Sequence, residues 1–259
     1  TIPRFGWEQR DTPEVQELIR ELFDDARDWV EVVRRLWDSW EDDAEIRDGA
    51  TGRFIDRDKL HYIDFDGPHF SVRGPSITPR PPQGQPIVSA LAHGTVAYRL
   101  IGRAADLGFV TPRDAADART ILAEVRAEQA AAGRAEDTVH VLGDVVVFVD
   151  ADATAAADRK SRLDARLGHD YVSDAHVFTG APVQLADLVQ LWQQAGLSGV
   201  RLRPATIPHD LEQITRGLVP ELQRRGAFRT SYEADTLRGL LGLPRPANRY
   251  VAVGAGRTS

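Results

Sequence analysis

The chain has 259 residues, of which 42% are hydrophobic and 27% charged, so it can bury a sizeable core and is not a disordered protein. Its net charge of -7 leaves no basic surplus to neutralise phosphates, which argues against a nucleic-acid binder. The sequence contains no apolar run of membrane-spanning length, no signal-peptide layout at its start and no cysteine. These features predict a soluble cytoplasmic protein without a membrane association.

The first predicted element is a long amphipathic helix that begins at Thr12-Pro13 and continues to Trp40. A hydroxyl residue followed by proline is a helix start signal, and apolar residues then recur every three or four positions. Residues 41–86 are expected to form a loop and hairpin insertion. Within it, residues 41–60 lack an apolar period, Asp66-Gly67 indicates a hairpin turn, and five prolines in residues 74–86 predict an irregular segment.

From residue 87 onward, short apolar runs alternate with helical patterns. Strands are predicted at residues 87–91, 107–110, 139–149 and 199–203, and helices at residues 96–104, 115–132, 151–167, 183–195 and 209–226. Near-continuous apolar strands separated by helices indicate a parallel sheet covered on both faces, so the predicted class is α/β. The Pro/Gly-rich end from Pro244 is expected to lie on the surface or fray. We expect one domain over residues 1–250 and a flexible tail over 251–259.

The usual catalytic and phosphate-loop motifs are absent, and the turn His93-Gly94-Thr95 is the more informative feature. It lies where a strand ends and a helix begins, a position where unbonded backbone N–H groups and the helix dipole attract an anion. An ordinary tight turn is the alternative interpretation. Thr111 follows the next strand and belongs to the same carboxyl edge, where α/β folds place their ligands.

Two arginines and a group of histidines are further candidates. Arg201 and Arg203 alternate to one face of the last strand and need anionic partners, either a ligand phosphate or buried carboxylates. The group His169, Asp170 and His176 resembles metal ligands, but its spacing fits neither one helical face nor a strand pair. The sequence therefore predicts no metal site.

Several segments carry a resemblance to a known family. They are residues 30–44 (VEVVRRLWDSWEDDA), 70–75 (FSVRGP), 80–86 (RPPQGQP), 199–204 (GVRLRP), 219–226 (VPELQRRG) and 243–249 (LPRPANR). In this order they resemble the luciferase-like flavin monooxygenases, in the branch of the nitrilotriacetate and dibenzothiophene-sulfone monooxygenases. The tryptophan-containing segment is the most specific of them.

The resemblance implies a bacterial luciferase-like TIM barrel that uses reduced FMN from a separate flavin reductase, together with oxygen, to oxygenate a small organic substrate. It also implies a homodimer, and some members of the wider superfamily use the deazaflavin F420. The cofactor-binding candidates are then His93, Gly94, Thr95, Thr111 and Arg203. No matched position supplies a convincing catalytic base. The rival interpretations are a truncated, non-catalytic homologue that binds flavin or another ligand, and an F420-dependent oxidoreductase.

The sequence also departs from the family pattern. The family's phosphate-binding turn after the fifth strand usually reads QAGAS, and the serine of that turn aligns with Gly94. Backbone N–H groups, His93 and Thr95 are then the remaining donors. A flavin-contacting tyrosine and histidine of the long helix align with Phe23 and Ile19. The family's first βα units have no counterpart before the matching residues 4–7, so we expect a barrel that lacks these units and shows four clear strands.

Overall fold

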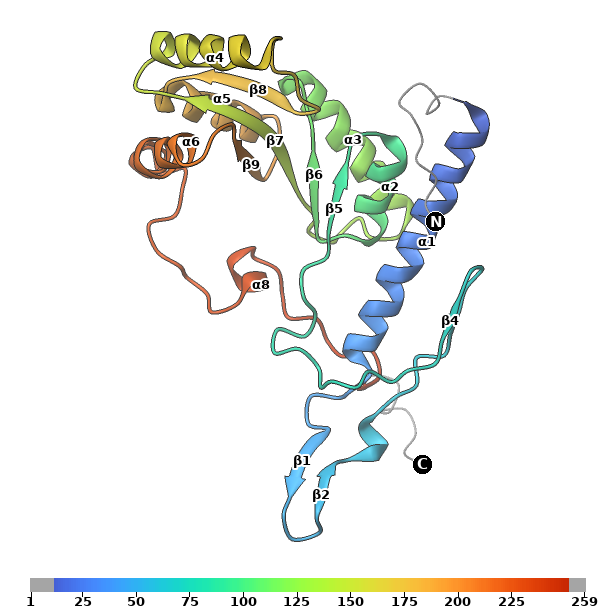
Figure 1. The fold of residues 1–259 in the computed structure, drawn as a ribbon. Helices are drawn as coiled ribbons and strands as arrows, with labels where there is room; N and C mark the ends of the chain where they lie inside the picture. The colour runs from blue at the N-terminus through green and yellow to red at the C-terminus, as the bar shows by residue number, and fades with distance from the viewer. Residues whose placement is uncertain (1–11, 252–259) are drawn as a thin grey trace. The chain divides into compact units, whose positions relative to one another are not determined.

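The computed structural model describes residues 12–251, and the chain divides into two compact units. Residues 12–88 and 233–251 form the first, here called the helix–hairpin unit, and residues 89–232 form the second, the sheet unit (Figure 1). The expectations for residues 4–7 and for the tail 252–259 lie outside the described residues. Among the residues described, no helix has the length and apolar character needed to cross a membrane.

The helix–hairpin unit begins with α1 (Pro13–Asp38), which confirms the predicted long helix. The Thr12 side chain accepts a hydrogen bond from the Val15 backbone N–H, and Pro13 occupies the first helical position. The helix ends just before Trp40, which forms an isolated antiparallel bridge with Leu60.

Two antiparallel hairpins follow α1. β1 (Glu45–Asp48) and β2 (Arg53–Ile55) pair where a loop was predicted, so that prediction was wrong. The two strands carry few apolar residues, so the sequence shows no strand period there. The turn is instead held by the Asp48 carboxylate, which accepts from the backbone N–H groups of Ala50 and Thr51. A 3-10 turn (Arg57–Lys59) comes next. β3 (Phe65–Asp66) and β4 (Ser71–Val72) then form the predicted Asp-Gly hairpin.

Residues 244–250 lie mostly on the surface, which was one alternative of the prediction, but they are held in place instead of fraying. After the short helix α8 (Leu237–Leu240), this segment returns to the end of α1. The side chain of Asn248 is buried and donates hydrogen bonds to the backbone oxygens of Asp38 and Trp40, both at 2.8 Å. Specific side-chain contacts thus fix a segment whose Pro/Gly content alone suggested fraying.

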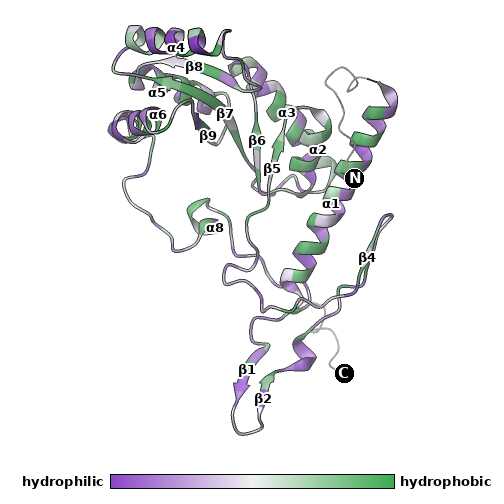
Figure 2. Cartoon of the chain, viewed as in Figure 1, coloured by the Kyte–Doolittle hydropathy of each residue, from purple (hydrophilic) through white to green (hydrophobic). Residues whose placement is uncertain are grey.

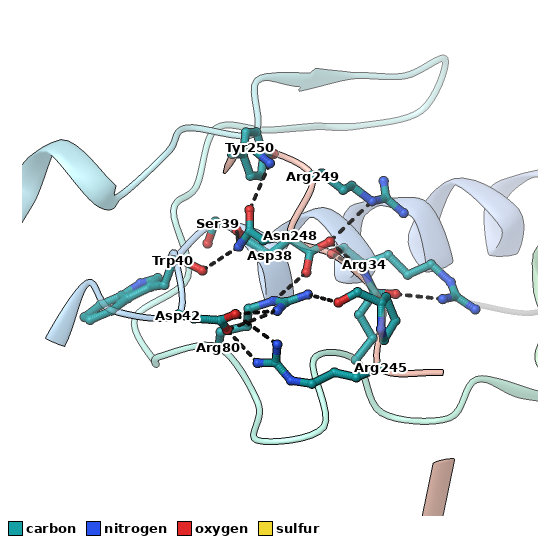
Figure 3. A network of polar contacts seen from close by, with 12 residues as sticks. Arg34, Asp38, Ser39, Trp40, Asp42, Arg80, Arg245, Asn248, Arg249 and Tyr250 are labelled. Atoms are coloured by element: carbon teal, nitrogen blue, oxygen red, sulfur yellow. Dashed lines mark hydrogen bonds and ion pairs between the residues drawn. The ribbon is translucent and has the colours of Figure 1, made fainter. Parts of the chain in front are cut away.

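A buried ion pair connects the proline-rich segment 74–86 to α1. This segment contains no helix or strand, as predicted. Arg80 Nε donates to Asp38 Oδ1 at 2.9 Å, and the two side chains are 2% and 0% exposed. Arg80 also donates to Asp42 and to the backbone oxygen of Pro246, so one guanidinium joins three segments of the chain (Figure 3).

The sheet unit contains five parallel strands with helices between them (Figure 1). The strands are β5 (Ser89–Ala92), β6 (Leu107–Val110), β7 (His140–Val149), β8 (His176–Gly180) and β9 (Gly199–Pro204). The helices are α2 (Thr95–Ala104), α3 (Ala115–Ala131), α4 (Ala153–Leu167), α5 (Pro182–Gln194), α6 (His209–Gln213) and α7 (Val219–Arg224). A π-helical segment (Ile214–Leu218) joins α6 to α7, so the predicted helix over 209–226 is observed in three parts.

The strand β8 was not predicted, and the expected count of four strands was therefore wrong. Its five residues include only two large apolar ones and follow a polar loop, so no strand period is visible. His176 begins this strand, with its ring 5.9 Å from the Trp192 ring. Burial lowers the pKa of His176.

The strand β7 has a divided edge. β9 pairs with residues 142–147, a stretch that overlaps the segments paired with β6 (140–143) and with β8 (145–149). Because a strand has two edges, β9 must lie along one of them, and β6 and then β8 along the other. The lateral ladder β5-β6-β7-β9 is therefore continuous, and β8 is added beside the second half of β7.

Helices cover the two faces of this sheet unequally. Ile101 of α2 packs over Gly108, and Trp192 of α5 packs over Gly143, where added Cβ atoms would come within 2.6 Å of these side chains. On the opposite face, Leu163 of α4 packs with Val146, beside a strand that is hydrophobic along most of its length (Figure 2). Farther toward β5 this second face is more open, and Leu91 is 46% exposed there.

Candidate functional site

The strand register brings four polar residues together at the open face of the sheet. Ala92 of β5 pairs with Val110 of β6, and Val110 pairs with Gly143 of β7, so the next residue of each strand lies at one common level. The residue at this level in β7 pairs in turn with its counterpart in β9. Residues at the same level of neighbouring parallel strands point to the same face. The four residues are His93, Thr111, Asp144 and Arg201.

A chain of polar contacts extends from this row. His93 Nδ1 lies 3.2 Å from Thr111 Oγ1, and His93 Nε2 lies 3.6 Å from Asp174 Oδ2. Asp174 belongs to the loop that precedes β8, and it accepts a hydrogen bond from Arg203 Nη1 at 3.0 Å. The structure therefore brings His93, Thr111 and Arg203 into one cluster.

Asp144 supports the arginine side of this cluster. Its carboxylate is fully buried and accepts two hydrogen bonds from Arg201, one of them from Nε at 2.8 Å. Arg203 Nη1 lies 3.9 Å from the same carboxylate, and the Arg201 guanidinium carbon lies 4.4 Å from the Phe109 ring centroid. Of the two kinds of partner expected for Arg201 and Arg203, the structure shows the carboxylates.

The cluster is close to electrical balance. Two arginines face two aspartates, and the His93 side chain, which is 46% exposed, lies beside them. Burial raises the pKa of Asp174, but hydrogen bonds from Arg203 and Ser173 outweigh this effect and hold the pKa below its usual value. Asp174 is thus ionised at neutral pH, and its half-exposed contacts with His93 and Arg203 are open to exchange with solvent or ligand.

The N-terminus of α2 adjoins His93. Gly94 caps the helix with an extended backbone and without a capping side chain, and no atom lies within 4 Å of the position where its Cβ would be. The Thr95 hydroxyl donates to Glu124 Oε2 at 3.1 Å, so it is already engaged. Thr95 is the first residue of α2, and its backbone N–H has no acceptor within the helix. Backbone N–H groups, a histidine and an arginine form a donor set suited to a phosphate group.

The structure assigns other roles to the remaining candidates. Asp114 caps α3 by accepting from the backbone N–H groups of Ala116 and Asp117. His169 contacts the backbone oxygen of its neighbour Asp170 at 2.9 Å. Within residues 12–251, no group of three or more histidine or acidic side chains is arranged to hold a metal ion.

Sequence reasoning did not find Asp144 or Asp174. Asp144 carried a usable signal, because an acidic residue interrupts an otherwise apolar strand and a buried carboxylate requires a partner. Asp174 carried none, since it lies in a polar loop whose position depends on the undetected strand β8.

A second polar cluster anchors α4 and α6 beyond the end of β7. Asp210 is fully buried and accepts hydrogen bonds from Arg159, from Thr206 and from the Val149 backbone N–H. Burial raises the pKa of Asp210, but these bonds outweigh it and keep the pKa below its usual value. Because its bonds are satisfied within the protein, we interpret this cluster as structural.

Comparison with known proteins identifies the family. The family model described as luciferase-like monooxygenase matches residues 19–196. The chain belongs to this family. The resemblance read from the sequence motifs is therefore confirmed.

Two curated relatives come from the branch that the sequence suggested. Nitrilotriacetate monooxygenase component A of Aminobacter aminovorans is 31% identical over 86% of this chain and 63% of its own length. Dibenzothiophene-sulfone monooxygenase of Rhodococcus erythropolis is 26% identical over 86% of this chain and 63% of its own length. The chain thus spans less than two thirds of the length of either relative.

A solved structure confirms the fold. A riboflavin lyase, crystallised with modified FMN and riboflavin, superposes with a TM-score of 0.77 over 93% of this chain and 66% of that one, at 24% identity. The chain therefore has the α/β, TIM-barrel-type fold of the luciferase-like family, over a shorter length than these homologues.

Proposed function

We propose that this protein is the oxygenase component of a two-component flavin monooxygenase. In this proposal it receives reduced FMN from a separate flavin reductase and uses oxygen to oxygenate a small organic substrate, as a homodimer in the cytoplasm. Family membership and the names of the relatives support the reaction class. The observation that carries the proposal is the phosphate-type donor set beside the open N-terminus of α2, at the carboxyl edge of the sheet.

In this proposal the FMN phosphate binds to the backbone N–H groups of Gly94 and Thr95, to His93 and to Arg203. Thr111 holds the His93 ring through its hydroxyl. Asp144 holds Arg201, and Asp174 gives up part of its contact with His93 and Arg203 as the phosphate binds.

The chemistry follows from the bound cofactor and its surroundings. Reduced flavin supplies the electrons for the activation of oxygen. The chain itself positions the cofactor, and the apolar side chains Leu91 and Phe109 on the same face provide a surface for a planar ring. Residues outside the phosphate contacts must exclude water from the reacting groups.

A comparison of FMN with riboflavin tests this assignment, because riboflavin lacks the phosphate. Binding is measured by quenching of flavin fluorescence for the unaltered chain and for His93→Ala, Arg203→Gln and the exposed control Arg216→Gln. A hydrogen bond to a charged group contributes about 1.5–3 kcal/mol, so each site variant is expected to weaken FMN binding by about 10- to 100-fold. Riboflavin binding should change little in any variant.

The outcomes separate the rival hypotheses. If the protein binds FMN but consumes no oxygen with NADH and a flavin reductase, it is a non-catalytic flavin-binding homologue. If the protein binds F420 and does not bind FMN, the hypothesis of an F420-dependent oxidoreductase is correct. If the site variants weaken FMN binding and riboflavin binding equally, the assignment of the phosphate site is contradicted. Sedimentation analysis tests whether the protein is a dimer.

A further inference from the structure

A second cleft opens at the opposite end of the sheet unit from the His93 cluster. It has a volume of about 450 Å³ and lies beside the start of β7, between α3, the loop 133–139 and the turn from α5 to β9. Small-molecule sites in proteins typically measure about 300–1,000 Å³. The cleft is therefore large enough for a small organic ligand.

The floor of this cleft is apolar and its rim is fixed. Leu122, Val125 and Val141 line it, and each is less than 5% exposed. Gln129 also lines it and is buried, and its amide nitrogen donates to the backbone oxygens of Arg134 and Asp137 at 2.7 and 2.6 Å. These two bonds hold the rim loop in place before any ligand binds.

One cation on the wall has no anionic partner. Arg126 lines the cleft, is exposed, and forms no ion pair with any residue in the described part of the chain. Its guanidinium lies against the turn at Gly196, where an added Cβ would be 3.7 Å from Nη2. The neighbouring Arg134 differs, because Asp137 and two backbone oxygens occupy its guanidinium.

We propose that this cleft is a second ligand site, separate from the flavin site, for a small organic carboxylate. The carboxylate pairs with Arg126, whose planar guanidinium suits bidentate recognition of that group. The apolar part of the ligand covers Leu122, Val125 and Val141. Asp137 also lines the cleft, but its charge is already paired with Arg134, so Arg126 determines the preference for an anion.

The test uses the full chain and three probes of similar size: benzoate, benzyl alcohol and benzylamine. Calorimetric titration is expected to show saturable binding of benzoate, with the neutral and cationic probes at least tenfold weaker. Arg126→Gln should weaken benzoate binding at least tenfold. Arg119→Gln removes an exposed arginine from the same helix but outside the cleft, and it should leave benzoate binding unchanged.

A blocking variant makes the test independent of the arginine. Ala135 is exposed and lines the cleft, so Ala135→Trp should abolish benzoate binding without disturbing the core. Equal benzoate affinity in all variants, or equal affinity for benzoate and benzyl alcohol, would overturn the proposal. FMN titration of the same variants should be unchanged, which keeps this result separate from the outcome for the flavin site.

Discussion

In the sheet unit, parallel strands pair in regular register and buried apolar side chains such as Ile101 and Trp192 attach the helices to them. In the helix–hairpin unit, the hairpins are short, and Arg80 and Asn248 join segments that lie far apart in the sequence. The apolar cluster there is small, with Val32, Ile63 and Phe65 as its buried members. Regular pairing and apolar contact thus organise one unit, whereas directional polar contacts organise much of the other.

This difference determines how each unit should respond to mutation. An apolar core loses stability in proportion to the volume removed, with little dependence on pH. A buried ion pair instead loses most when one partner is removed and the other charge stays behind. Three predictions test the contrast, from the largest expected effect to the smallest.

Arg80→Leu is expected to have the largest effect. It removes the buried guanidinium that donates to the fully buried Asp38 carboxylate, which then keeps Gln85 and a 3.5 Å contact with Arg249. Breaking a buried pair in this way costs about 3–5 kcal/mol. Urea unfolding followed by circular dichroism measures the loss. The double variant Asp38→Leu/Arg80→Leu should regain part of it, because no charge is then stranded. A loss below about 1 kcal/mol for the single variant would show that water reaches Asp38.

Leu185→Ala should destabilise the sheet unit somewhat less. Leu185 is fully buried on α5, and truncation of a buried leucine costs about 2–5 kcal/mol. Leu191→Ala lies on the same helix at 49% exposure and should cost about 0.5 kcal/mol or less. Unfolding curves at pH 6 and pH 8 should give the same difference between the variants. A strong pH dependence would show that polar contacts, and not packing, dominate there.

Arg245→Gln should have the smallest effect. Hydrogen bonds from Arg245 and then Arg80 lower the pKa of Asp42 from 3.8 to about 2, despite partial burial that raises it. The depressed pKa contributes stability above pH 3.8, which is lost as pH falls toward 2. Since Asp42 is half exposed, we expect a loss of about 1 kcal/mol or less at pH 6.

Melting temperatures from pH 6 to pH 2.5 check this last prediction. The difference between Arg245→Gln and the unaltered chain should shrink as the pH falls toward 2, because increasing protonation of Asp42 weakens its interaction with Arg245 in the unaltered chain. A difference that stays constant to pH 2.5 would contradict the assigned cause.

The same contrast explains what could be predicted from the sequence. Hydrophobic periodicity predicted α1, the strands β5, β6, β7 and β9, and the helices between them, because apolar contact determines those elements. It failed for β1, β2 and β8, whose residues are mostly polar or whose pairing is short. The positions of the turns after the strands predicted that His93, Gly94, Thr95 and Thr111 share one edge of the sheet. The place of Asp174 depends on a contact between distant parts of the sequence, which no local pattern indicates. The cofactor roles of these residues stay predictions.

The divided edge of β7 has a consequence for how this sheet can change. The ladder β5-β6-β7-β9 is complete without β8, so α4 and β8 form a module inserted between β7 and α5. The loop inside that module supplies Asp174, which contacts both His93 and Arg203. A graft of a different α4–β8 segment would alter the charge of the cluster while the strands that carry His93 and Arg203 keep their register, which makes this module a place to redesign ligand preference.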